Sequence, residues 1–145
     1  HPRQFYAGEL RTALEYYRPL CTRDEPWAMG VEAAADFRAY GDASKEGPAL
    51  LATLLRLSLD RSAADGADGM SLAASAASWF ATAYGLLGFE AAAWPSAELC
   101  FSPVLPIGWS RVAIPFTWRR TRFTVDVSPR AVTYRHTSGP AIRLR

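Results

Sequence analysis

Residues 70–88 read MSLAASAASWFATAYGLLG, and this run decides how the rest of the chain is interpreted. It is apolar on nearly every side at helical spacing, which predicts a long helix over Met70–Leu87 buried on most of its surface. Trp79 and Tyr84 lie within it and are expected to belong to the core. Ser75, Ser78, Thr82 and Gly85 interrupt the apolar run, and such small residues favour close packing between soluble helices rather than a membrane span.

The sequence before this run predicts three further helices. Apolar residues recur every three or four positions in Gly8–Tyr17, Met29–Tyr40 and Ala49–Leu59. Pro19 and the Gly41-Asp42 pair mark two helix ends, because proline and glycine break the helical pattern. The second and third helices are close enough in sequence to form a short antiparallel hairpin.

The pattern changes after Gly88 from a helical to a two-residue period. Alternating apolar residues predict strands at Arg111–Trp118 and Arg122–Val127, with Phe123, Val125 and Val127 facing the core. Further candidate strands are Ala131–His136 and Ala141–Leu144. Helices followed by strands define an α+β chain in which the strands form a small antiparallel sheet.

Four helices, one of them apolar all round, would make a poor isolated bundle. The last helix would expose apolar surface that no segment of this sequence covers. The chain also begins with His1 rather than Met. We therefore expect it to work with upstream segments that it does not itself contain.

Composition narrows the class of protein. Half of the 145 residues are hydrophobic, about a fifth are charged, and the net charge is +2. Residues 1–100 carry a balance of −5 and residues 101–145 a balance of +7, which indicates two differently built parts. Cys21 and Cys100 fit neither a disulfide framework nor a metal site and are interpreted as reduced thiols of a cytoplasmic protein. His1 and His136 have no third ligand nearby, so no metal or other cofactor is expected.

Three stretches together resemble glycoside hydrolase family 65, which includes maltose, trehalose and kojibiose phosphorylases and related hydrolases. They are YYRPLCTRD at 16–24, DGMSLAAS at 68–75 and LCFSPVLPIGW at 99–109. Each is weak alone, but their order and spacing match those of the family over nearly the whole chain.

The resemblance implies that residues 1–89 are the C-terminal part of an (α/α)6 catalytic barrel and that residues 90–145 form a C-terminal β domain. It also implies an inverting mechanism on α-linked disaccharides or oligosaccharides. The family's general acid is a glutamate on an earlier barrel segment, and this sequence holds no candidate for it. Phosphorylases of this group are often dimers, so a homodimer of the parent enzyme is a further implication.

The residues that hold phosphate in the family's phosphorylases are replaced. Aligned without gaps, two serines fall at Glu25 and Pro26, and a histidine falls at Ser71. A carboxylate at Glu25 would repel phosphate, which favours hydrolysis over phosphorolysis. A phosphorylase with an atypical phosphate site, or a non-catalytic carbohydrate-associated module, remains as an alternative. Ser71 is kept as a substrate-binding candidate.

A hydrolase needs a general base, and Glu25 stands where the attacking phosphate would lie. Glu25 is our first candidate for this base. The alternative is that it is a solvated loop glutamate without a catalytic role. Glu32, about two helical turns further on, is a weaker candidate. Trp27 could stack on a sugar ring, although simple core packing explains it as well.

Arginines crowd the predicted sheet, and basic residues interleaved with aromatics on strands can bind single-stranded nucleic acid. The expected arrangement is simpler: the arginines cover the solvent face or dock on the acidic helices. We therefore expect no nucleic-acid partner. No uninterrupted apolar run is long enough to span a membrane.

Overall fold

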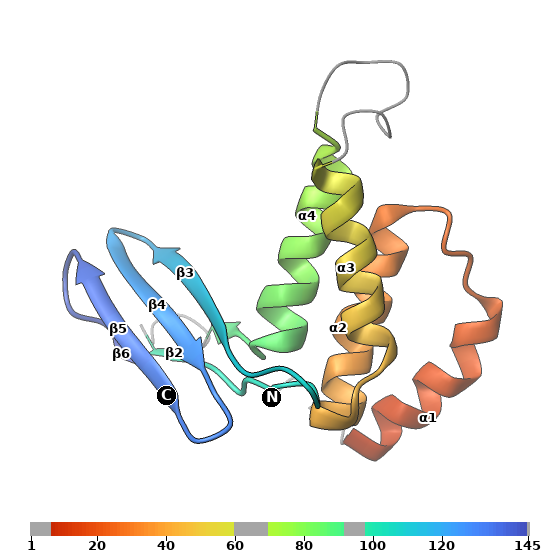
Figure 1. The fold of residues 1–145 in the computed structure, drawn as a ribbon, viewed down its shortest axis with the longest axis horizontal. Helices are drawn as coiled ribbons and strands as arrows, with labels where there is room; N and C mark the ends of the chain where they lie inside the picture. The colour runs from red at the N-terminus through yellow and green to blue at the C-terminus, as the bar shows by residue number, and fades with distance from the viewer. Residues whose placement is uncertain (1–6, 60–69, 92–97, 145) are drawn as a thin grey trace.

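A computed structural model describes residues 7–59, 70–91 and 98–144 as a helical layer beside a β layer (Figure 1). The helical layer contains α1 (Ala7–Tyr17), α2 (Pro26–Tyr40), α3 (Glu46–Leu59) and α4 (Leu72–Phe80). Two short 3-10 turns, η1 (Arg18–Leu20) and η2 (Gly41–Ala43), follow α1 and α2, and a π-helix, η3 (Ala81–Leu86), continues α4. The strands are β1 (Glu90–Ala91), β2 (Glu98–Cys100), β3 (Val112–Trp118), β4 (Thr121–Val127), β5 (Val132–Ser138) and β6 (Arg143–Leu144).

Helix α2 is the centre of the helical layer. It forms the predicted antiparallel hairpin with α3 and packs closely on α4, where a Cβ added to Gly30 would lie 2.9 Å from the Ala77 Cβ. Gly85 allows an equally close approach of η3, because a Cβ there would lie 2.6 Å from the Ala34 Cα. The core between these helices contains Met29, Ala33, Phe37, Leu50, Leu51, Leu54, Ala77, Ala81 and Leu86.

Three predicted helix starts need correction by two or three residues. Helix α3 begins at Glu46 rather than Ala49. Helix α2 begins at Pro26 rather than Met29, since proline is well suited to the first helical position. The last helix begins at Leu72 rather than Met70, because the Ser71 hydroxyl caps it by accepting a hydrogen bond from the Ala74 amide at 3.2 Å. Asp68 followed by Gly69 is a sequence typical of a helix N-terminal cap, but this pair lies outside the described residues.

The predicted single long helix over Met70–Leu87 changes type at Ala81. Its continuation has π-helical hydrogen bonds, with the Leu87 amide donating to the Thr82 carbonyl at 2.9 Å. The wider turn alters which side chains share a face. Trp79 and Tyr84 are 48% and 46% exposed, so the expectation that both belong to the core is wrong for the described structure.

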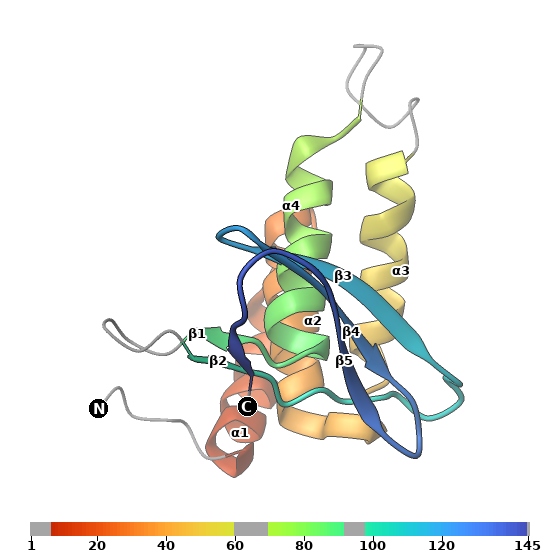
Figure 2. The same cartoon turned by 90° about the vertical axis from the view of Figure 1, so that its left-hand side faces the viewer.

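Strands β3, β4 and β5 form the predicted antiparallel sheet, in that order, with Ile114 opposite Val125 and Val125 opposite Tyr134. Phe123, Val125 and Val127 are buried, as the two-residue pattern predicted. In Figure 2 this sheet lies in front of the helices, and its strands run obliquely to α3 and α4. The inner face of the sheet continues into a core of Ala83, Leu87, Phe89, Leu99, Phe101, Phe116, Phe123, Val125 and Val127.

A second, smaller sheet was not predicted. It has the order β1-β2-β6, with β1 antiparallel and β6 parallel to β2. The predicted strand at Ala141–Leu144 is reduced to the two residues of β6. Strands of two or three residues are too short to show an alternating pattern in the sequence. They are recognised only because β1 and β6 pair with β2 in the folded chain.

Candidate functional site

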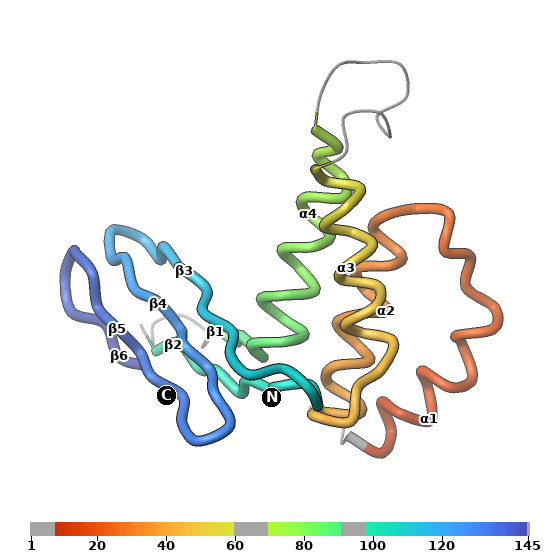
Figure 3. The backbone as a smooth tube through the Cα atoms, viewed as in Figure 1, coloured from red at the N-terminus to blue at the C-terminus, as the bar shows by residue number. Residues whose placement is uncertain are grey.

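The loop from Cys21 to Glu25 brings the chain from η1 to the start of α2. Figure 3 shows it rising to the end of the helical layer where α2 and α4 both begin. Glu25 occupies the N-cap position of α2 with extended backbone (φ −105°, ψ 132°), and its carbonyl accepts a hydrogen bond from the Met29 amide at 3.3 Å. Its side chain is exposed and makes no capping hydrogen bond. The Glu25 carboxylate is therefore held on a defined backbone while remaining open to solvent.

Glu32 has a different environment, although it lies only two turns further along α2. Its side chain is 8% exposed and accepts hydrogen bonds from two arginines. Arg18 donates through Nε to Oε1 at 3.1 Å, and Arg23 donates through Nε to Oε2 at 2.8 Å and through Nη2 to Oε1 at 2.5 Å. The two oxygens of Glu32 are therefore engaged by guanidinium groups.

The ion pairs extend beyond Glu32 in both directions. Arg18 also bonds to the Asp36 Oδ1, and Arg23 reaches the Glu46 Oε2 at 3.2 Å. Asp36, 2% exposed, accepts from the Ser44 hydroxyl and from the Gly47 amide at 3.0 Å. We call these five charged residues, Arg18, Arg23, Glu32, Asp36 and Glu46, the charge network. It joins η1, the Cys21–Glu25 loop, α2 and α3.

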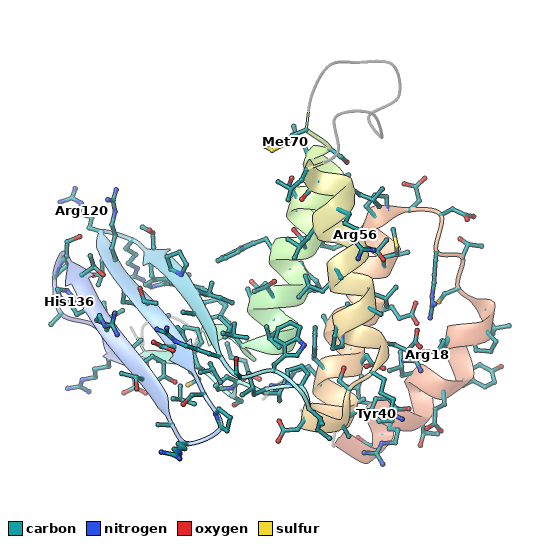
Figure 4. The ribbon with its side chains drawn as sticks, viewed as in Figure 1. Arg18, Tyr40, Arg56, Met70, Arg120 and His136 are labelled. Carbon is teal, nitrogen blue, oxygen red and sulfur yellow. The ribbon has the colours of Figure 1, made fainter. Side chains whose placement is uncertain are left out.

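The acidic groups change the pKa of both arginines. The hydrogen bond to Glu32 is the largest influence on Arg23 and raises its pKa above the ordinary value. Burial lowers the pKa of Arg18, but the hydrogen bond and charge of Asp36 outweigh burial and leave that pKa raised. Figure 4 shows Arg18 on the side of α2 that faces α1. Both arginines are thus firmly cationic partners of the buried carboxylates.

Trp27 is 53% exposed and packs on Phe80, with ring centroids 5.0 Å apart. Phe80 in turn packs on the exposed Tyr84 at 5.0 Å. The other side of Trp27 borders a groove of about 440 Å³ between α1 and α2, lined also by Leu14, Tyr17, Val31 and Glu32. Trp27 is therefore a surface aromatic of a largely apolar groove, and simple core packing does not describe it.

Ser71 lies at the same end of the layer as Glu25, because α2 and α4 run in the same direction (Figure 1). Gly30 against Ala77 and Ala34 against Gly85 fix that direction. The Ser71 hydroxyl is committed to capping α4. The structure thus places Glu25, Trp27 and Ser71 at one end of the helical layer. Glu32 lies further along α2, inside the charge network.

The sheet arginines lie on the solvent face, and the aromatics lie on the opposite one. Trp118 packs on Phe89 at 5.7 Å and Tyr134 on Phe101 at 5.7 Å, whereas Arg122 and Arg135 are exposed. Figure 4 shows Arg120 and His136 on the part of the sheet remote from the helices. The interleaved basic and aromatic surface of a single-strand binder is therefore not formed by these residues.

Two arginines of the sheet form ion pairs within the sheet rather than with the acidic helices. Arg111 pairs with Asp126 on the neighbouring strand, with Nη2 2.7 Å from Oδ2, and Arg135 lies 3.9 Å from the same oxygen. Between the layers, Arg38 on α2 lies 3.8 Å from Glu90 on β1, so that in this pair the cation belongs to the helix. The apolar inner face of the sheet makes the main contact instead.

Among residues 7–59, 70–91 and 98–144, no group of three His, Cys, Asp or Glu side chains is placed to hold a metal ion. No helix among those described is both long and apolar enough to cross a membrane.

Sequence reasoning missed the charge network, although one signal for it was present. Glu32 and Asp36 are four residues apart on one helix, which places both acids on the same face. Two acids on the face of an otherwise apolar helix require cationic partners when that face is buried. Arg18 and Arg23, which both precede α2 in the sequence, were possible partners.

Comparisons with known proteins concern the family and the fold of the chain. Residues 94–145 match the family model described as glycosyl hydrolase family 65, C-terminal domain. No curated protein matches the chain significantly. Among solved structures, the chain is similar to one described as "Putative kojibiose phosphorylase from human microbiome", with 18% identity and a TM-score of 0.76.

That structural match covers 97% of this chain and 20% of the other chain. The present chain therefore spans about a fifth of the length of the protein it resembles. At this identity the match establishes a shared fold, while the family model supplies the link in sequence. The resemblance to glycoside hydrolase family 65 is confirmed, by sequence over residues 94–145 and by fold over nearly the whole chain.

Proposed function

We propose that this chain is the C-terminal part of an inverting α-glucoside hydrolase, in which Glu25 is the general base that activates water. The observation that carries the proposal is the charge of the Cys21–Glu25 loop. Asp24 and Glu25 are both exposed, and the guanidinium of Arg23 points to Glu32 and Glu46. A phosphate dianion brought to this loop would meet two carboxylates and an arginine already neutralised by acids.

Water activation suits the geometry of Glu25. The backbone on the C-terminal side of Glu25 is fixed, by Pro26 at the first position of α2 and by the hydrogen bond from the Met29 amide to the Glu25 carbonyl. The carboxylate itself extends into solvent. An inverting hydrolase needs such a base about 6.5–9.5 Å from its general acid, leaving room for water. Glu32 suits this role less well, because accepting a proton would weaken its ion pairs with two arginines.

The general acid is assigned to barrel segments that precede this chain in the complete enzyme. In this proposal residues 1–89 complete an (α/α)6 barrel, and residues 90–145 form the β domain beside it. The half-exposed Trp79 and Tyr84 support the division, since they leave aromatic surface on α4 and η3 for further helices to cover. The complete enzyme would be cytoplasmic and, like related phosphorylases, a homodimer.

The substrate class proposed is an α-linked disaccharide or oligosaccharide such as trehalose, kojibiose or maltose. Trp27, two residues after Glu25, exposes about half of its side chain next to an apolar groove. A pyranose ring buries its C–H face well on such an indole. Ser71 contributes less, because its hydroxyl already caps α4.

Phosphorolysis is the second candidate function. It is favoured by the similarity to a structure described as a kojibiose phosphorylase. A non-catalytic carbohydrate-associated module would have the same fold without turnover. All three possibilities differ in what they require of Glu25.

The test is Glu25→Gln in the complete enzyme that contains this chain. Glutamine keeps the shape of the side chain but cannot take a proton from water, so kcat for hydrolysis should fall about 10²- to 10⁴-fold with little change in KM. Asp24→Asn, the adjacent exposed acid, is the matched control and should be milder. Near-normal turnover of Glu25→Gln would reduce Glu25 to a solvated loop residue.

A further inference from the structure

The Cys21–Glu25 loop is attached to the helical layer by one side chain in its middle. At its start the Cys21 amide donates to the Tyr17 carbonyl at 3.1 Å, and at its end the Glu25 carbonyl accepts from Met29. Both of these are backbone contacts to the adjoining helices. Between them, Arg23 crosses to Glu32 and Glu46 on α2 and α3.

We infer that Arg23 is a positioning residue: its paired hydrogen bonds to Glu32 fix the loop so that the Glu25 carboxylate is held at the site. The inference rests on the role proposed above for Glu25. Arg23 acts only through the backbone of the loop. It is 43% exposed and its guanidinium is turned toward the buried Glu32 and the exposed Glu46, so it is not itself a catalytic residue.

The geometry of the pair explains why an arginine is needed. Nε and Nη2 of Arg23 each contact a different oxygen of Glu32, at 2.8 and 2.5 Å. This two-point contact fixes the orientation of the guanidinium as well as its distance, which a lysine ammonium cannot do. Glu32 is in turn immobilised, because it is buried on α2 and its Oε1 also accepts a hydrogen bond from Arg18.

Position matters for a base that acts on water. A displacement of about 1 Å at a catalytic group can cost roughly a hundredfold in rate. Arg23 is only two residues before Glu25, so losing its contact frees the loop close to the carboxylate. The charge network therefore has a functional consequence beyond stabilising the helices.

The test uses Arg23→Lys and Arg23→Ala in the complete enzyme, with Arg111→Ala as control. Arg111 makes a similar two-point contact with Asp126, but on the sheet. The first readout is hydrogen–deuterium exchange of the peptide covering residues 20–29. Exchange there should rise in Arg23→Ala, rise less in Arg23→Lys, and stay unchanged in Arg111→Ala. Unchanged exchange in both Arg23 variants would overturn the inference.

The second readout is a double-mutant cycle. Arg23→Ala should lower kcat about ten- to a hundredfold with KM little changed, and Arg23→Lys should recover part of that loss. In a Glu25→Gln background, Arg23→Ala should cost almost nothing further, because the group it positions has lost its function. Equal losses in both backgrounds would show that Arg23 does not act through Glu25.

The two proposals fail in distinguishable ways. If Glu25→Gln alone keeps normal turnover, the assignment of the base is wrong and the positioning role loses its target. The exchange measurement still decides separately whether Arg23 holds the loop. If Arg23→Ala does not fold, Arg23→Lys keeps the charge, and its exchange and kcat carry the test.

Discussion

The helical layer and the sheet layer bury different chemistry. Under the Cys21–Glu25 loop, the helical layer encloses two carboxylates, Glu32 and Asp36, with arginines and backbone amides as partners. The sheet layer encloses aromatic rings, with Phe116 contacting Phe89, Phe101 and Phe123 at centroid distances of 5.4–5.7 Å. Its ion pairs lie on the outside, where Arg111 and Asp126 meet.

The difference matters because buried ion pairs fix the orientation of the segments that they join, whereas buried aromatic rings mainly stabilise the fold. An ion pair in a low-dielectric interior has few satisfactory geometries, and breaking one partner is costly. A cluster of rings tolerates small shifts as long as the volume is filled. The layer with the oriented charges is the one that carries the proposed base.

The largest expected effect is on the sheet layer. Phe116→Ala removes the ring that joins the sheet to Phe89 and Trp79, so the free energy of unfolding should fall by about 3–5 kcal/mol. Phe116→Leu retains most of the volume and should lose roughly 1–1.5 kcal/mol. Chemical denaturation measures both. A loss below 1 kcal/mol for the alanine variant would show that the aromatic cluster does not stabilise the layer.

Asp36→Ala should come next, in the helical layer. It leaves the Arg18 guanidinium, the Ser44 hydroxyl and the Gly47 amide without their shared acceptor. We expect a loss of about 3 kcal/mol, near the lower end for a broken buried pair because Arg18 is partly exposed. Asp36→Asn keeps one acceptor and should lose about half as much. If the two variants unfold at the same denaturant concentration, the charge of Asp36 contributes nothing.

The sequence predicted the long elements and missed what depends on tertiary contact. Four helices and the strands β3 to β5 follow from apolar residues repeated over seven or more positions. β1, β2 and β6 are too short for that, and β6 pairs in parallel with a strand more than forty residues away. The exposure of Trp79 follows from the packing around α4, which periodicity alone does not define.

The candidate site was only partly predictable for the same reason. Glu25, Trp27 and Ser71 could be named as candidates because short motifs align them with the family, and their roles stay predictions. Arg18 contacts Asp36 across eighteen positions and Arg23 contacts Glu46 across twenty-three. Only the folded loop brings these charges together, so the charge network and the buried state of Glu32 had to come from the structure.

The smallest expected effect is on the outer ion pair of the sheet. The hydrogen bond from Arg111 lowers the pKa of Asp126 below its ordinary value. A lowered pKa means that the pair stabilises the fold fully above about pH 4, the ordinary aspartate pKa, and that stabilisation is lost as the pH falls through the lower folded-state pKa. The melting temperature of the wild type should exceed that of Asp126→Asn slightly at pH 6, and the two should converge below pH 4. A difference that grows on acidification would contradict this.

In the proposed hydrolase, the loop at Glu25 directs water, and not phosphate, to the sugar. The most direct measurement is proton NMR of the first product released from an α-linked glucose disaccharide by the complete enzyme, with and without inorganic phosphate. We expect β-glucose as the first product of inversion, at a rate that phosphate does not increase. Glucose 1-phosphate formed only when phosphate is present would exclude this hydrolytic role and establish phosphorolysis.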